Sequence, residues 1–157
     1  ALICDTGLRL SEALGLHKDD VRLDADIPHL IIAPRPWRRL KTTTSERIVP
    51  LVGNALWASQ RAYRSAEGGY LFPRYIRDQN TLSNSASAAM NKWLKHNVSH
   101  ELVVHSLRHA FRDRLRNVGT PADVIDVVGG WARVGIGETY GRGHSLSTIE
   151  KWMQKIV

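Results

Sequence analysis

Residues 105–119 read His-Ser-Leu-Arg-His-Ala-Phe-Arg-Asp-Arg-Leu-Arg-Asn-Val-Gly and carry the clearest helical pattern in the chain. The apolar residues recur at intervals of four, four and three, as expected for one buried face of a helix: Leu107, Phe111, Leu115 and Val118. Three polar residues at i, i+3 and i+7 share a neighbouring stripe: His105, Arg108 and Arg112. We therefore expect a helix over residues 105–118 that carries a histidine and two arginines beside its buried face.

The segments around this helix predict further helices and a small sheet. Residues 1–16 indicate a helix that is broken near Gly7, and residues 53–67, 81–97 and 146–156 each favour a helix. After Gly119, Thr120 is expected to cap another helix, with Pro121 in its first turn. Its inward-facing residues should be Ala122, Ile125 and Val128.

The region between Asp19 and Leu51 has a different pattern, with short apolar stretches interrupted by prolines. Such stretches predict antiparallel strands over residues 21–23, 29–33, 37–41 and 47–50. The sequence shows no internal repeat and no domain boundary. The predicted fold class is therefore α+β and mainly helical, a single domain over residues 1–157 with a small antiparallel sheet.

The composition favours a nucleic-acid partner. The 157 residues are 43% hydrophobic, ordinary for a globular domain, but the net charge is +7 and the pI is about 10.0. Basic side chains bind polyanions because each neutralised phosphate releases counterions. The single cysteine, Cys4, excludes an internal disulfide and suits a reducing compartment. No signal peptide and no membrane-spanning run is evident, so we expect a soluble cytoplasmic protein.

One tyrosine stands downstream of groups suited to hold a phosphate. Tyr140 lies in Glu-Thr-Tyr-Gly-Arg-Gly-His, nine residues after a tryptophan, Trp131. A phenol attacks a phosphodiester only if cations neutralise the oxygens on phosphorus and the leaving hydroxyl receives a proton. The upstream groups that meet these needs are Arg9, Lys41, His105 and Arg108. This set predicts covalent cleavage of DNA strands, and no residue cluster calls for a metal ion or a nucleotide cofactor.

The order and spacing of these residues, from Thr6 to about His144, resemble the tyrosine recombinases of the phage integrase family. The resemblance implies six catalytic residues: Arg9, Lys41, His105, Arg108, Trp131 and Tyr140. Glu12 and His109 would support them, with Glu12 orienting a neighbour and His109 the rival of His105. In this reading the arginines stabilise the transition state, Lys41 protonates the leaving 5′-oxygen and Tyr140 forms a 3′-phosphotyrosyl link.

The same resemblance implies the partners and the extent of the chain. Double-stranded DNA is the expected substrate, bound by a homotetramer with accessory DNA-bending proteins as further partners. Family members carry a core-binding domain and a further helix before the first arginine motif, whereas Arg9 is almost at the start here. We therefore expect a catalytic domain without these parts. Two alternatives stay open: relaxation of DNA like a type IB topoisomerase, and a DNA-binding module whose catalytic set has decayed.

The last predicted helix, over residues 146–156, has an apolar stripe that needs a partner surface: Leu146, Ile149, Met153 and Ile156. Docking on a neighbouring subunit and folding back on its own domain are both compatible with this stripe.

Overall fold

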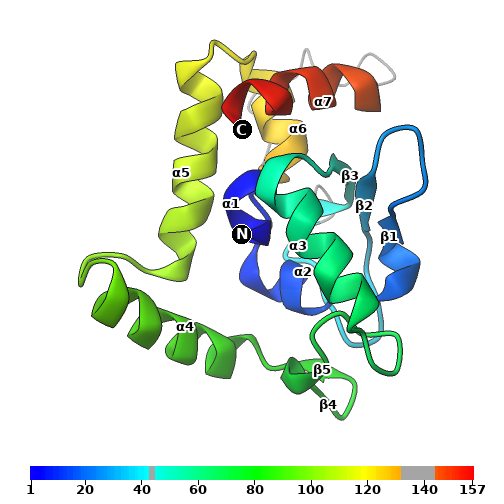
Figure 1. The fold of residues 1–157 in the computed structure, drawn as a ribbon, viewed down its shortest axis with the longest axis vertical. Helices are drawn as coiled ribbons and strands as arrows, with labels where there is room; N and C mark the ends of the chain where they lie inside the picture. Colours follow the sequence, from blue (N-terminus) through cyan, green and yellow to red (C-terminus); the bar gives the residue numbers. More distant parts are fainter. Residues whose placement is uncertain (43–44, 132–143) are drawn as a thin grey trace.

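The computed structural model describes residues 1–42, 45–131 and 144–157. Two short helices, α1 (Leu2–Thr6) and α2 (Leu10–Leu14), begin the chain, and α1 lies between two longer helices, α3 (Gly53–Arg64) and α5 (Val104–Asn117) (Figure 1). Gly7 separates the pair with a φ of 62°. A Cβ on Gly7 would lie 2.4 Å from a ring carbon of Phe111, so this turn requires glycine. The predicted break of the first helix near Gly7 is confirmed.

The sheet is antiparallel with the strand order β1 (Val21–Arg22), β2 (His29–Ile32) and β3 (Arg47–Pro50). Leu30 in the middle strand pairs with Val21 on one side and with Val49 on the other. Leu30, Ile32 and Val49 are fully buried, which places one face of the sheet in the core. These strands occur where the sequence predicted them. A second ribbon, β4 (Ile76–Arg77) with β5 (Asn80–Thr81), was not predicted.

The remaining helices also follow the sequence pattern. They are α4 (Ser83–Asn97), α6 (Ala122–Gly129) and α7 (Leu146–Met153). Short 3₁₀ turns in the described residues include η1 (Lys18–Asp20), η3 (Pro73–Tyr75) and η5 (Gln154–Ile156). On α5 the predicted core residues Phe111 and Leu115 are fully buried. None of the helices in the described part of the chain is long and apolar enough to cross a membrane.

Residues 37–41 do not form the predicted strand. The backbones of Arg35 and Arg38 bond each other in both directions at 3.0 Å, which closes a tight turn. The side chain of Arg38 is fully buried and donates to the carbonyls of Gly15 and Ala33 and to the carboxylate of Asp20. A buried guanidinium needs these acceptors, so Arg38 turns the segment inward and away from the sheet.

The predicted start of α6 was also wrong. Its N-cap is Pro121 rather than Thr120, whose buried hydroxyl has no hydrogen-bond partner within the described part of the chain. Ala122 is exposed, and Val124 takes the inward position beside Ile125 and Val128. The proline fixes its own φ near the helical value but gives no side-chain acceptor, and the helix begins one residue later than the sequence indicated.

The C-terminal helix packs on its own domain. Ile149 and Met153 on α7 are buried in the main hydrophobic core, and α7 lies against β3 (Figure 1). Arg114 on α5 donates to the carbonyl of Ile156 at 3.0 Å. Of the two arrangements that the sequence left open, the structure has the one within the chain.

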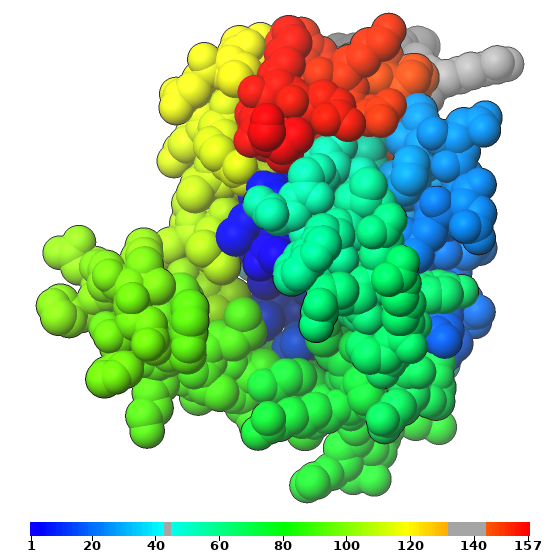
Figure 2. All heavy atoms as spheres, viewed as in Figure 1, coloured from blue at the N-terminus to red at the C-terminus, as the bar shows by residue number. Residues whose placement is uncertain are grey.

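The view in Figure 2 shows a hollow between α4 and α3 whose floor is formed by the first residues of the chain. Its volume is about 320 Å³, and mostly apolar side chains line it, among them Leu2, Leu14, Phe72 and Met90. Helix α4 nevertheless contacts α2, α5 and η3.

Replacing Asp20 tests how strongly the buried Arg38 depends on its partner. Asp20→Asn leaves a fully buried guanidinium without a counter-charge, which should lower the free energy of unfolding by about 3 kcal/mol. Asp113→Asn is the control, because it breaks an exposed ion pair with Arg116 at 3.5 Å and should cost under about 1 kcal/mol. Urea unfolding measures both, and equal losses in the two variants would contradict the prediction.

Candidate active site

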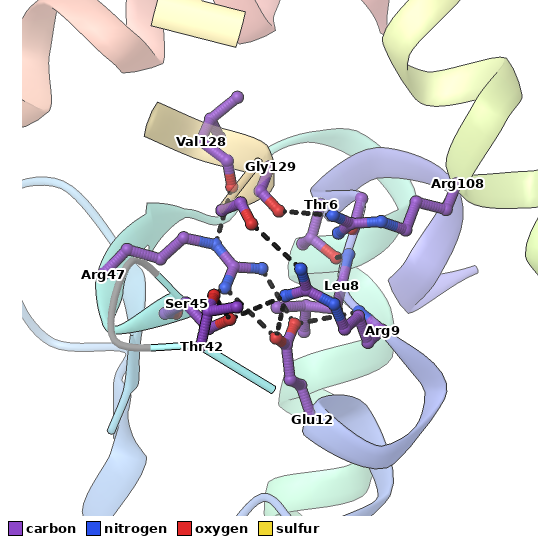
Figure 3. A network of polar contacts seen from close by, with 12 residues as sticks. Thr6, Leu8, Arg9, Glu12, Thr42, Ser45, Arg47, Arg108, Val128 and Gly129 are labelled. Atoms are coloured by element: carbon purple, nitrogen blue, oxygen red, sulfur yellow. Dashed lines mark hydrogen bonds and ion pairs between the residues drawn. The ribbon is translucent and has the colours of Figure 1, made fainter. Parts of the chain in front are cut away.

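Arg9 stands at the N-cap of α2, where its side chain is held on one edge and open on the other. Its Nη1 donates to Glu12 at 2.7 Å and to the Ser45 hydroxyl at 3.0 Å, and its Nη2 donates to the carbonyl of Gly130 at 3.0 Å (Figure 3). Among the described residues, Nε and the second Nη2 hydrogen make no bond. The side chain is 21% exposed, so this edge is free to contact two oxygens of one anion.

Glu12 is the only carboxylate in this cluster of described residues, and it binds two arginines. Its oxygens accept from Arg9 and, at 2.9 and 3.3 Å, from the guanidinium of Arg47 on β3. Burial alone would raise the pKa of Glu12, but the hydrogen bond and charge of Arg47, followed by the bonds from Arg9, lower it below the ordinary value. Glu12 is therefore ionised at neutral pH and holds Arg9 and Arg47 by charge as well as by hydrogen bonds.

Three guanidinium groups converge on the C-terminal end of α6. The carbonyl of Val128 accepts from Arg47 at 2.8 Å, that of Gly129 from Arg108 at 2.7 Å, and that of Gly130 from Arg9 at 3.0 Å (Figure 3). The last carbonyls of a helix lack partners within it and carry the negative end of the helix dipole. These three carbonyls therefore fix arginines from three different elements at one point.

Arg108 is almost fully buried on α5 and pairs with no carboxylate of the described residues. It donates to the carbonyls of Gly7 and Gly129, and its guanidinium carbon lies 4.2 Å from the ring centre of Trp131. Burial, together with the charges of Arg9 and Arg47, lowers its pKa to about 10, so the group keeps its charge at neutral pH. Among the described residues, the direct contacts of this buried cation are thus carbonyls and an aromatic face, and the charge of Glu12 stabilises it without a hydrogen bond.

Trp131 packs against a glycine and two arginines. A Cβ on Gly129 would lie 1.6 Å from the indole, so only glycine fits under the ring. Besides Arg108, the guanidinium of Arg112, which pairs with Asp126 at 3.3 Å, lies 4.8 Å from the centre of the same ring. The ring therefore covers the residue whose carbonyl Arg108 binds, and the indole has a fixed place beside the two guanidinium groups.

His105 lies in the first turn of α5, three residues before Arg108. The side chain of Asn91 on α4 accepts from the backbone N–H of Val104 at 2.8 Å, which fixes the start of the helix. Burial lowers the pKa of His105, and the charges of His109, Arg108, Arg9 and Lys41 lower it further. The ring is therefore neutral at pH 7. His109 packs edge-on against it with ring centres 4.6 Å apart, close enough to remain its neighbour and rival.

Lys41 is exposed in the long segment between β2 and β3, and two anchors hold that segment. Upstream, Trp37 and Arg38 donate to the carbonyl of Gly15 at the C-terminal end of α2, at 2.9 and 3.1 Å. Downstream, Ser45 is buried and bonds both Arg9 and Thr42 at 3.0 Å. The charge of the Lys41 ammonium is one of those that lower the pKa of His105, so Lys41 acts electrostatically on the site.

The structure thus brings Arg9, Glu12, Arg108, His105 and Trp131 together, with Lys41 at the edge. Tyr140 lies outside the described residues, so its place relative to this cluster stays a prediction. The sequence analysis missed three residues that build the site: Arg38, Ser45 and Arg47. Arg47 lies 81 residues from its acceptor on α6, and no local pattern reveals such a contact.

Protonation of Glu12 should weaken the fold in acid. Because the pKa of the folded state is lowered, ionised Glu12 stabilises the fold above the ordinary value of 4.5, and this contribution is lost as the pH falls below it. Glu12→Gln should lose about 3 kcal/mol of unfolding free energy at pH 7, since it strands the buried Arg47.

Urea unfolding over a pH series measures this, and the difference between the variant and the wild type should shrink below pH 4.5. Glu101→Gln, at an exposed carboxylate, is the control and should follow the wild type. A difference that stays constant down to low pH would contradict the role given to ionised Glu12.

The chain matches the model of the phage integrase family over residues 1–145. Two similar solved structures are of the Tn1549 transposon integrase with circular intermediate DNA: one has a TM-score of 0.61 and 19% identity over 99% of this chain and 57% of that chain. The other has a TM-score of 0.60 and 22% identity over 97% and 55%. A third, with transposon right end DNA, has a TM-score of 0.58 and 17% identity over 98% and 56%.

This chain therefore spans little more than half the length of the solved structures it matches. Among the curated proteins none matches it significantly. The solved structures share the mainly helical fold with its small antiparallel sheet, and the match to the family model includes the residues of the cluster. The chain belongs to the phage integrase family of tyrosine recombinases.

Proposed function

We propose that residues 1–157 are the catalytic domain of a site-specific DNA recombinase that cleaves and rejoins strands through a 3′-phosphotyrosyl intermediate on Tyr140. One observation carries the proposal: three guanidinium groups meet at one helix end, two of them share a single carboxylate, and one edge of Arg9 is open to solvent. The charges of Arg9, Arg47 and Arg108 exceed that of Glu12 by two. Proteins bury such an excess at a cost, and an anionic ligand that completes the site offsets it.

The charge of the cluster suits the transition state of phosphodiester cleavage. A phosphodiester carries one negative charge, and attack by a phenol oxygen that loses its proton adds a second one at phosphorus. Preorganised donors aimed at this developing charge contribute more to such catalysis than any other single effect. Arg9 offers a bidentate edge and Arg108 a charge fixed by carbonyls, so both serve the nonbridging oxygens without reorganisation.

The side chains around these arginines carry out the two proton transfers of the reaction. A neutral His105 is able to accept the phenol proton of Tyr140 as the new O–P bond forms. Lys41 gives a proton to the 5′-oxygen as its bond to phosphorus breaks, which leaves a free 5′-hydroxyl. The indole N–H of Trp131 donates to a phosphate oxygen but does not titrate. The phosphotyrosyl bond conserves the energy of the broken bond, so the strands rejoin without a nucleotide cofactor.

The family and the solved structures support DNA as the substrate. The Tn1549 transposon integrase is described in complex with circular intermediate DNA and with transposon right end DNA. For this chain we infer double-stranded DNA as the substrate and a homotetramer on paired sites, with an origin in a phage or another mobile element. Its basic composition, with a net charge of +7, supports a DNA partner.

The covalent step is tested with nicked duplex DNA that carries a randomised sequence around the nick. Wild-type protein should form an adduct that survives denaturation, and the captured DNA supplies the substrate for further assays. Tyr140→Phe should bind this DNA with unchanged affinity and form no adduct. The control Tyr63→Phe, on α3, should form the adduct as the wild type does. An adduct of equal yield from the Tyr140 variant would contradict the assignment of Tyr140 as the nucleophile.

The selected substrate also separates the two alternative functions. A binding module without catalytic function retains DNA but gives no adduct. A topoisomerase-like enzyme relaxes a supercoiled plasmid that carries the sequence but does not exchange strands between two duplexes. A recombinase yields the exchanged products, which denaturing gels resolve by length.

Arg108 is expected to act on the transition state more than on DNA binding. Arg108→Ala should slow adduct formation by about 100-fold or more, and Arg108→Lys should recover little, since an ammonium does not span the carbonyls of Gly7 and Gly129. Arg116→Ala on the same helix removes an exposed arginine and is the control. A rate that falls only in proportion to DNA affinity would make Arg108 a backbone contact.

A further inference from the structure

Ser45 links the segment that carries Lys41 to the guanidinium of Arg9. Its hydroxyl is fully buried, accepts from Arg9 Nη1 at 3.0 Å and lies 3.0 Å from the hydroxyl of Thr42 (Figure 3). The backbone N–H of Ser45 also donates to the carbonyl of Thr42 at 3.1 Å. Thr42 directly follows Lys41. A chain of hydrogen bonds therefore runs from the anion-binding arginine to the residue beside the proposed proton donor.

The chemistry of the serine hydroxyl suits a link of this kind. A hydroxyl has one hydrogen to donate and two lone pairs that accept, so it is able to bond a guanidinium and a second hydroxyl together. Bonds to a charged donor such as Arg9 are the stronger class. Burial removes water as a competing partner for Ser45, and such a bond is worth more than the same contact at the surface.

Removing this hydroxyl would loosen the segment that carries Lys41 more than it would loosen Arg9. Arg9 would keep its bonds to Glu12 and to the carbonyl of Gly130. The segment between β2 and β3 would keep its upstream anchor at Arg38 and lose a tie on the downstream side. Lys41 lies between the two anchors, so the freedom of its ammonium depends on both of them.

We propose that Ser45 is a positioning residue that couples the Lys41 segment to Arg9 and thereby holds the proton donor at the leaving oxygen. This inference rests on the function proposed above. It adds to that function a residue that connects the proton donor to the anion-binding arginine through hydrogen bonds. Positioning a catalytic group lowers the barrier by removing its freedom before the reaction, and a small misplacement already slows a proton transfer.

The leaving group of the substrate distinguishes positioning of Lys41 from a general effect on the site. Ser45→Ala should slow cleavage of the ordinary phosphodiester by about 10-fold, a fraction of the effect of a whole general acid. A substrate with sulfur in place of the scissile 5′-oxygen needs little proton assistance because a thiolate leaves readily. On that substrate Ser45→Ala should cleave within about 2-fold of the wild type.

Two further variants make the comparison specific. Ser59→Ala on α3 is the matched control, since Ser59 is also fully buried but its hydroxyl has no hydrogen-bond partner among the described residues. It should cleave both substrates at the wild-type rate. Lys41→Ala should be slow on the ordinary substrate and rescued by sulfur, because it removes the proton donor itself. Thermal unfolding of each variant shows that the domain remains folded at the assay temperature.

The outcomes separate this inference from the proposed function. A wild type that forms no adduct overturns the proposed function and this inference with it. An active wild type together with equal slowing of Ser45→Ala on both substrates means that the hydroxyl acts through Arg9 or the fold, and this overturns the inference alone. Two other results would also overturn the inference alone. One is a Ser45→Ala variant that cleaves the ordinary substrate at the wild-type rate, and the other is a Lys41→Ala variant that the sulfur substrate does not rescue. Selective rescue of both variants supports it.

Discussion

The C-terminal end of α6 is the point on which the site depends. Three successive carbonyls, those of Val128, Gly129 and Gly130, each accept from an arginine of a different element. A helix end presents such carbonyls unpaired, with the negative end of its dipole behind them, and cations placed there gain about 0.3–1 kcal/mol each. Helix α6 therefore orients three guanidinium groups without a carboxylate for each one, and their charge remains available to an anion.

That arrangement explains why a single buried carboxylate is enough to hold the arginines of the cluster in place. Glu12 bonds Arg9 and Arg47 and reduces their mutual repulsion, while Arg108 contacts carbonyls and the face of Trp131 in the described part of the chain. A second carboxylate would neutralise the positive charge that the proposed reaction needs. The two arginines that Glu12 binds have different roles. Arg47 donates four hydrogen bonds to other groups of the protein, whereas Arg9 keeps one edge open to solvent.

The sequence predicted what local patterns encode. Periodicity located α5, β2 and β3, and the break at Gly7 followed from the glycine itself. The strand expected over residues 37–41 is absent because its short apolar stretch does not show that Arg38 binds the carbonyls of Gly15 and Ala33 in the interior. The candidate residues Arg9, Glu12, His105 and Arg108 came from motif spacing. Arg47 and Ser45 escaped notice because their partners lie on other elements, so a single sequence carries no local signal for them.

Helix α2 joins stability and site geometry in one short element. Its N-terminus carries Arg9, and the carbonyl of Gly15 at its other end holds Trp37 and Arg38. A Cβ on Gly15 would lie 2.8 Å from the Arg38 side chain, so the two segments pack in direct contact. The five residues of α2 thus set the separation between the anion-binding arginine and the upstream anchor of the Lys41 segment. Because an α-helix has a fixed rise of about 1.5 Å per residue, a change in the length or pitch of α2 would shift Arg9 and the Lys41 segment relative to each other.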